Sequence, residues 1–149
     1  MVKGISNRSS RFIEITVFLL VLLWMCTAAS KLLSFDQYQS QMYNQPLPHW
    51  MAFILIWSLP PIEILTGILL ILPKLKIWGL LSSIILLVVF SIYVELMTFR
   101  VFERVPCSCG GVLKNMTWTV HLFFNLFFLL LSILAIITHN RERRLIGTV

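Results

Sequence analysis

The chain has 149 residues, 58% of them hydrophobic and 12% charged, and it carries a formal net charge of +6. Soluble domains average roughly 45–50% apolar and 25% charged residues, so this composition excludes an ordinary soluble domain and indicates a protein that folds in lipid. The positive charge does not indicate binding of nucleic acid, because the basic residues lie in short tails and loops between apolar runs, where they act as topology signals.

Four apolar runs are each close to the ~20 residues that cross a hydrocarbon core. Backbone polar groups must be satisfied internally in lipid, so each run is predicted to form a helix. The sequence therefore predicts an all-α, polytopic membrane protein, in which residues 1–149 form one domain, an antiparallel bundle of four transmembrane helices. The predicted spans are Phe12–Ser30, Met51–Leu72, Ile77–Phe99 and Met116–Thr138.

The first run has features of a secretory signal sequence, because basic residues precede it and Thr27-Ala28-Ala29 could act as a cleavage site. Two observations favour a retained span. The apolar stretch is long for the core of a signal sequence. Trp24 and Met25 are also too bulky to precede Cys26 in a lipoprotein signal. We therefore expect the segment to stay as the first transmembrane helix.

The orientation follows from Lys and Arg, which concentrate on the cytoplasmic side of membrane proteins. With four spans, one side carries eight of these residues and the other carries four. The eight are Lys3, Arg8, Arg11, Lys74, Lys76, Arg141, Arg143 and Arg144, and the four are Lys31, Arg100, Arg104 and Lys114. This bias predicts that both termini are cytoplasmic and that the loops at 31–50 and 100–115 face outward.

The connections restrict how the spans are arranged. Pro73-Lys74-Leu75-Lys76 is a very short link, so the second and third spans must be antiparallel neighbours. The first outer loop is long enough for a short interfacial helix around Phe35–Tyr43, which Pro46-Leu47-Pro48 ends before the second span.

The outer loop before the fourth span contains Cys107-Ser108-Cys109-Gly110-Gly111. Two cysteines that flank one residue can form a disulfide in an oxidising compartment. A ring that small is strained, and strained disulfides are the better oxidants. The loop is therefore a candidate thiol–disulfide exchange site. The alternatives are a static disulfide, a pair of idle thiols, or a soft-metal site such as Cu(I) on two thiolates.

Several candidate residues lie inside the spans near their outer ends. Cys26 could reach the loop cysteines, or it could be a small packing residue. His121 and Asn125 are four residues apart and share a helix face, and Trp118 lies one turn above on the same stripe. His121 could relay protons or donate a hydrogen bond to a quinone carbonyl, or it could bond to a neighbouring helix.

Two carboxylates also lie within the predicted spans. Glu63 is near the middle of the second span, where a charge costs roughly 2.5–3.5 kcal/mol on insertion scales. We expect it to face the bundle interior and to be protonated or paired, in either a functional or a structural role. Glu95 lies near the outer end of the third span, and an ion pair with Arg100 is the simpler explanation for it.

Two motifs resemble a known family. Leu59–Leu70 resembles the second-helix signature of DoxX-like membrane proteins. Pro106–Gly111, followed by Trp118, His121 and Asn125, resembles the methylamine-utilisation MauE branch of that group. The similarity extends over nearly the whole chain, from the first span to the fourth.

The resemblance implies a four-helix bundle in the bacterial inner membrane with a redox-associated role. MauE-type proteins are linked to disulfide formation in exported proteins, beside a thioredoxin-like partner. The arrangement is also similar to quinone-coupled thiol oxidases of the DsbB and vitamin K epoxide reductase type. Those oxidases use two cysteine pairs, whereas this chain has three cysteines. Cys107 and Cys109 match only one of these pairs. Either this pair both shuttles electrons and reacts beside the quinone, or the partner supplies the second pair, or the quinone analogy fails.

The leading hypothesis is a thiol–disulfide redox protein that passes electrons between a periplasmic thioredoxin-fold partner and membrane quinone through Cys107 and Cys109. Whether it is an enzyme is left open. The residues expected beside the quinone are His121, Trp118, Asn125 and Glu95. The alternative is a non-enzymatic accessory subunit that anchors a larger cell-envelope complex. Transport is less favoured, because the spans carry few charges and no broken-helix pattern.

Overall fold

The structure is a computed structural model that describes residues 2–99 and 118–146. Within these ranges all regular secondary structure is helical, and there are five helices. They are α1 (Val2–Leu33), α2 (Phe35–Tyr43), α3 (His49–Ile71), α4 (Lys76–Thr98) and α5 (Trp118–Ile146).

Four of these helices are long and apolar enough to cross a membrane, which confirms the predicted fold class. The stretches are Ser10–Leu33, His49–Ile71, Lys76–Leu96 and Thr119–Arg141. The helices α1 and α5 extend well past the predicted spans, because hydropathy marks only the apolar part of a helix and the backbone hydrogen bonds continue into polar residues. The short helix expected in the first loop is α2, and its bounds match the prediction.

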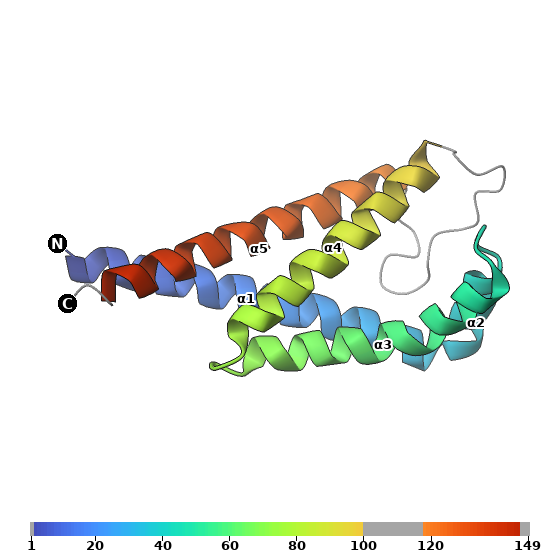
Figure 1. Ribbon diagram of the computed structural model, residues 1–149, viewed down its shortest axis with the longest axis horizontal. Helices are drawn as coiled ribbons and strands as arrows, with labels where there is room; N and C mark the ends of the chain where they lie inside the picture. The colour runs from blue at the N-terminus through green and yellow to red at the C-terminus, as the bar shows by residue number, and fades with distance from the viewer. Residues whose placement is uncertain (1, 100–117, 147–149) are drawn as a thin grey trace.

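The four long helices form a bundle in which α1 packs against α3 and α5, and α4 packs against the same two helices. The predicted pairing of the second and third spans is confirmed, since α3 and α4 are antiparallel neighbours (Figure 1). The start of α1 and the end of α5 lie at the same end of the bundle as the α3–α4 link (Figure 1). That arrangement agrees with termini on one side of the membrane, while the cytoplasmic assignment stays a prediction.

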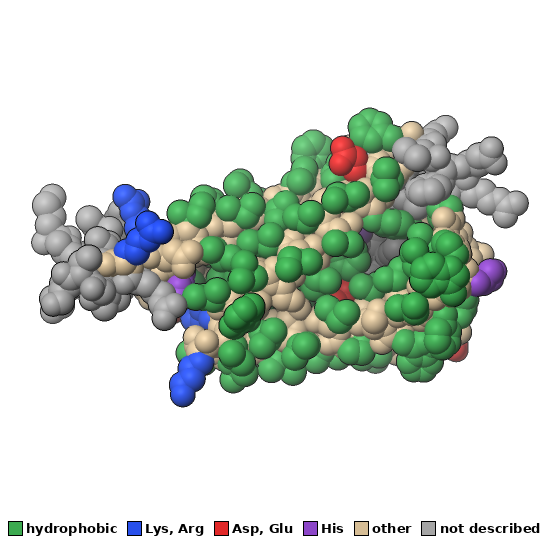
Figure 2. Space-filling model, in the orientation of Figure 1, with side chains coloured by type: hydrophobic (Ala, Val, Ile, Leu, Met, Phe, Trp, Pro, Cys, Tyr) green, Lys and Arg blue, Asp and Glu red, His purple; other side chains and the backbone are tan. Residues whose placement is uncertain are grey.

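The outer surface of the bundle is apolar. In the most apolar stretch of each span, only between 22% and 33% of the residues are buried inside the protein. Hydrophobic side chains cover the middle of the molecule, and Lys and Arg side chains lie toward the end with the termini (Figure 2). A surface of this kind is stable only against lipid, and the chain is a multi-pass membrane protein.

Close helix packing at the α3–α4 crossing depends on Gly79. A Cβ atom added there would lie 2.6 Å from the Leu70 backbone nitrogen and 2.9 Å from the Leu69 carbonyl carbon. Small residues let transmembrane helices approach in this way. The contact brings the two helices together near their short link, whereas α4 diverges from α3 toward its other end (Figure 1).

The helix α2 is anchored to the bundle through α3. Tyr38 and Met42 are buried against Ile56, and the Tyr38 hydroxyl donates a 3.2 Å hydrogen bond to the Leu55 carbonyl oxygen. This contact places α2 beside the diverging ends of α3 and α4, where it helps to enclose the interior of the bundle.

One residue in the charge count was placed wrongly. Lys31 was assigned to the first outer loop, but it lies in the last turn of α1 and is buried. The predicted loop at 31–50 therefore starts three residues too early, because α1 continues to Leu33. The orientation bias is unaffected, because removing Lys31 from the side with fewer basic residues only strengthens it.

Candidate functional site

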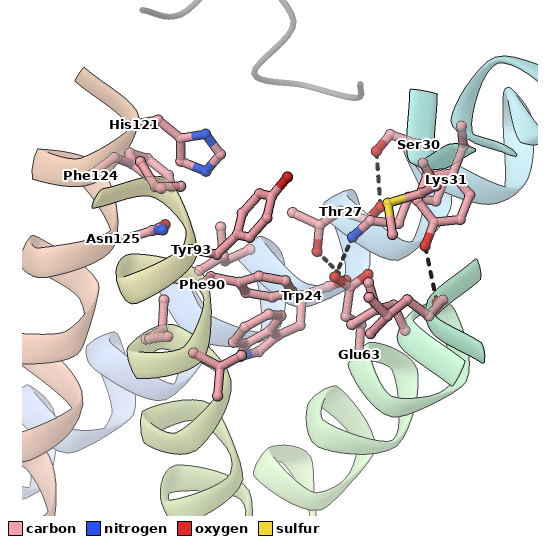
Figure 3. Close-up of a pocket in the computed structure, with 18 of the residues that line it drawn as sticks. Trp24, Thr27, Ser30, Lys31, Glu63, Phe90, Tyr93, His121, Phe124 and Asn125 are labelled. Atoms are coloured by element: carbon pink, nitrogen blue, oxygen red, sulfur yellow. Dashed lines mark hydrogen bonds and ion pairs between the residues drawn. The ribbon is translucent and has the colours of Figure 1, made fainter. Parts of the chain in front are cut away.

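A cavity of about 370 Å³ lies inside the bundle, at the end where α4 finishes and α5 begins. All five described helices contribute to its lining. Its walls are mostly apolar, and a small number of polar side chains project into it (Figure 3). Apolar cavities of this size with a few convergent polar groups are typical of small-molecule sites.

Aromatic rings form the centre of the cavity wall. Trp24 from α1 and Phe90 from α4 lie with ring centroids 6.3 Å apart, and Tyr93 lies one turn beyond Phe90 (Figure 3). The Tyr93 hydroxyl donates to the Gln45 side-chain oxygen. Phe124 from α5 lines the same space. The flat faces of such rings suit a flat apolar ligand.

His121 and Asn125 line the cavity together, as their spacing on one face of a helix predicts. Among the residues that the structure describes, nothing accepts or donates a hydrogen bond at His121 Nδ1 or at Asn125 Nδ2, and both atoms are buried. Leaving such a group unpaired costs about 1–3 kcal/mol. Within the described part of the chain, the alternative of a bond from His121 to a neighbouring helix is therefore not seen at Nδ1.

On the other side of the cavity Glu63 of α3 forms an ion pair with Lys31 of α1. The Glu63 side chain is 0% exposed and the Lys31 side chain 11%. Thr27 lies beside the carboxylate (Figure 3). The expectation that Glu63 faces the interior and is paired is confirmed. Its second oxygen, Oε2, has no hydrogen-bond partner within the described part of the chain.

The sequence reasoning missed Lys31 as the partner of Glu63. The available signal was the spacing of Trp24, Thr27 and Lys31, which recur at intervals of three and four residues and so share one face of α1. Two aromatic rings flank the ammonium group, with Nζ 6.0 Å from the Tyr38 ring centroid and 5.9 Å from that of Phe90. Charge counting treats a Lys at the end of a span as exposed, because it takes no account of which face of the helix points into the bundle.

The other predicted residues are not part of the cavity wall that the structure describes. Glu95 is exposed and does not line the cavity. Cys26 is a free thiol that is also exposed, so it does not pack inside the bundle as the simpler expectation required.

Four further candidates cannot be placed. Trp118 begins α5, but its side chain is outside the described part. Cys107, Cys109 and Arg100 lie outside the described residues altogether. The Cu(I) alternative and the Glu95–Arg100 pair therefore stay predictions. Within 2–99 and 118–146 no group of three or more His, Cys, Asp or Glu side chains could hold a metal ion.

The family described as "Methylamine utilisation protein MauE" matches residues 9–138 of the chain. No curated protein and no solved structure matches it. The matched range includes all four spans and the Cys-Ser-Cys segment.

Proposed function

The chain belongs to the MauE family, and from this membership we propose that it is a membrane thiol–disulfide redox protein. Cys107 and Cys109 exchange thiol for disulfide with an exported partner of the thioredoxin type. A thioredoxin-like partner is proposed because its paired thiols can exchange with a strained pair in either direction. The protein lies in the bacterial inner membrane, with the two cysteines on the outer side.

The observation that supports this proposal best is the position of the cavity. It lies where α4 ends and α5 begins, and the segment with Cys107 and Cys109 joins these two helix ends in the sequence. The lining residues Tyr93, within the last two turns of α4, and His121, in the first turn of α5, lie on either side of that segment in the sequence. A thiol pair and an apolar site for an electron acceptor are therefore connected to the same end of the bundle.

The exchange itself is balanced in electrons and protons. A thiolate of the partner attacks one sulfur of the Cys107–Cys109 disulfide, and the other cysteine leaves as a thiolate. The second thiol of the partner then resolves the mixed disulfide. The partner loses two electrons and two protons, which Cys107 and Cys109 gain as two thiols. In the reverse direction the same steps reduce the partner.

A quinone is the acceptor that the cavity residues fit. The walls are aromatic and apolar, and His121 Nδ1 and Asn125 Nδ2 lie among them without partners in the described part of the chain. These two groups could donate hydrogen bonds to a quinone carbonyl. A bound quinone would supply the capacity to take up two electrons and two protons. The residues of the chain would hold its ring against Trp24, Phe90 and Phe124 and keep water away from it.

A second function is favoured by the description of the family. Its name refers to methylamine utilisation, so an accessory role in that process fits the chain. In that case the protein stabilises or anchors a larger complex of the cell envelope, and the Cys107–Cys109 disulfide only holds its loop together. Stoichiometric co-purification with a partner and resistance of the disulfide to mild reductants would favour this role.

The two functions are separated by a thiol-exchange experiment. Full-length protein in lipid nanodiscs is oxidised, mixed with a reduced thioredoxin-fold protein, and quenched with an alkylating reagent that shifts thiol-containing chains on a gel. We expect the wild type to oxidise one equivalent of the partner. The Cys107→Ser/Cys109→Ser variant should oxidise none.

Cys26→Ser is the matched control, because Cys26 is exposed and does not line the cavity, and it should behave as the wild type. When the Cys107→Ser variant is mixed with the partner in its oxidised form, the Cys109 thiolate should open the partner's disulfide and stay joined to one of its sulfurs as a mixed disulfide, because the variant has no second thiol to resolve it; otherwise the converse variant should do so through Cys107. If the double variant oxidises the partner as fast as the wild type, the proposed function is wrong.

A further inference from the structure

The buried ion pair adds a second polar group to the wall of the cavity. An ammonium group has three N–H donors, and within the described residues Glu63 Oε1 is the hydrogen-bond acceptor of Lys31. The rings of Tyr38 and Phe90 do not accept hydrogen bonds from Lys31 Nζ, because both ring centroids are about 6 Å from it, at the limit of a cation–π contact. Lys31 therefore presents donors to the cavity while Glu63 holds it in place.

This ion pair lies opposite the other polar group. In Figure 3 Lys31 and Glu63 lie on one side of the cavity and His121 and Asn125 on the other, with the ring of Tyr93 between them. The cavity thus has hydrogen-bond donors on two opposite sides, with aromatic rings between them. A ligand with a single polar head would satisfy one side and leave the other unpaired, whereas a ligand with an acceptor oxygen at each end would satisfy both.

The cavity also opens toward the lipid-facing surface. Val89 of α4 lines it and is 56% exposed, and Leu55 and Leu59 of α3 line the facing side. The apolar surface is hollowed between α3 and α4, near the end where they diverge (Figure 2). A ligand can therefore reach the cavity sideways from the bilayer, which favours a lipid-soluble compound over a water-soluble one.

From these contacts we propose that Lys31, positioned by Glu63, is a ligand-binding residue for a flat, lipid-soluble compound with acceptor oxygens at opposite ends, of the para-quinone class. Lys31 donates to one oxygen, and His121 with Asn125 donates to the other. The choice of a quinone as the ligand rests on the proposed function. The placement of Lys31 on one side of the cavity and of His121 with Asn125 on the other comes from the structure and does not depend on that function.

The test measures binding of 2-methyl-1,4-naphthoquinone to the purified full-length protein in detergent, by quenching of tryptophan fluorescence and by equilibrium dialysis. Removing Lys31 alone leaves Glu63 buried without a partner and can prevent folding. The informative variant is therefore Lys31→Met/Glu63→Met, since replacing both members of a buried ion pair with apolar residues of similar size is often tolerated. Lys74→Met, at the exposed α3–α4 link, removes the same charge elsewhere and serves as the matched control.

We expect the double variant to keep its thermal stability and to bind the quinone about tenfold to hundredfold more weakly, as the loss of a hydrogen bond to a charged group predicts. Lys74→Met should bind as the wild type. A second probe, 2-methylnaphthalene, has the same rings without the oxygens and should bind the wild type and the double variant equally. Binding of the quinone to the double variant within twofold of the wild type would overturn the proposal.

The quinone-binding measurement is repeated on the Cys107→Ser/Cys109→Ser variant, which lacks the two thiols and so cannot exchange them with a partner. If this variant binds the quinone through Lys31 while the wild type fails to exchange thiols, the inference stands and the proposed function fails. If the wild type exchanges thiols but shows no saturable quinone binding, the inference fails and the exchange function stands.

Discussion

The Trp24 indole on α1 donates a 2.9 Å hydrogen bond from Nε1 to the Ser83 hydroxyl oxygen on α4, and both side chains are buried. Each of these helices packs mainly on α3 and α5, so the bond joins the two helices across the interior of the bundle. Because Trp24 also lines the cavity, the bond holds one of its aromatic walls in position.

This bond should contribute measurably to stability. A double-mutant cycle of Trp24→Phe and Ser83→Ala is expected to give a coupling free energy of about 0.5–1.5 kcal/mol, as for one hydrogen bond in a protein interior. The measurement is reversible unfolding in mixed micelles with increasing denaturing detergent. Trp78→Phe is the control, because Trp78 is 64% exposed. A coupling energy near zero would mean that the bond is not maintained in lipid.

The Lys31–Glu63 pair predicts a strong asymmetry between single and double substitutions. Lys31→Met leaves a carboxylate that is 0% exposed without its partner and is expected to destabilise the protein by about 3–5 kcal/mol. Adding Glu63→Met should restore most of that loss. The same unfolding measurement checks this, and equal melting of Lys31→Met and the wild type would show that the pair is not buried as described.

Two buried glycines should differ in their tolerance of a methyl group. In Gly79→Ala the new Cβ meets backbone atoms of Leu69 and Leu70 on the facing helix, at 2.9 and 2.6 Å, which can only be relieved by moving α3 and α4 apart. We expect a loss of about 1–3 kcal/mol. In Gly67→Ala the Cβ meets the terminal methyl of Met25, a flexible group that can turn away.

The two glycine variants therefore control for each other in one measurement. Thermal unfolding in detergent should give a clearly lower midpoint for Gly79→Ala than for Gly67→Ala. The reverse order would indicate that the α3–α4 crossing is looser than the structure describes.

Asn125 is expected to matter for binding and not for stability. No hydrogen bond at Nδ2 is lost within the described residues when it is replaced, so Asn125→Leu should leave the unfolding midpoint unchanged or raise it. The same variant should weaken binding of 2-methyl-1,4-naphthoquinone by about fivefold to tenfold. Lower stability with unchanged binding would instead assign Asn125 to helix packing.

The orientation can be tested with single cysteines in a background where Cys26, Cys107 and Cys109 are serine. Both termini and the α3–α4 link are expected on the cytoplasmic side. A thiol at Lys74→Cys should then react with a membrane-impermeant reagent only after the membrane is opened. A thiol at Ser40→Cys, which is exposed on α2, should react in intact cells. The opposite pattern would reverse the topology.

Much of the fold could be predicted because lipid restricts what a backbone can do. Spans of apolar residues must be helical, and the link between Ile71 and Lys76 is too short for anything but an antiparallel pair. The stripe of His121 and Asn125 could also be predicted, since residues four apart share a helix face. That Glu63 faces inward followed from the free energy of placing a charge in hydrocarbon.

What only the tertiary structure decided is how side chains from different helices meet. Hydropathy and charge counting use only the position of a residue along the sequence and hold no information on contacts between helices. They therefore assigned Lys31 to a loop and gave Glu63 no partner. The same limits hid the bond from Trp24 to Ser83. These contacts depend on the rotation of each helix about its axis and on the angle at which α4 leaves α3, and packing against neighbouring helices sets both. The sequence by itself therefore determined the spans and the polar residues within them, and the packing of the helices decided which of those residues share one cavity.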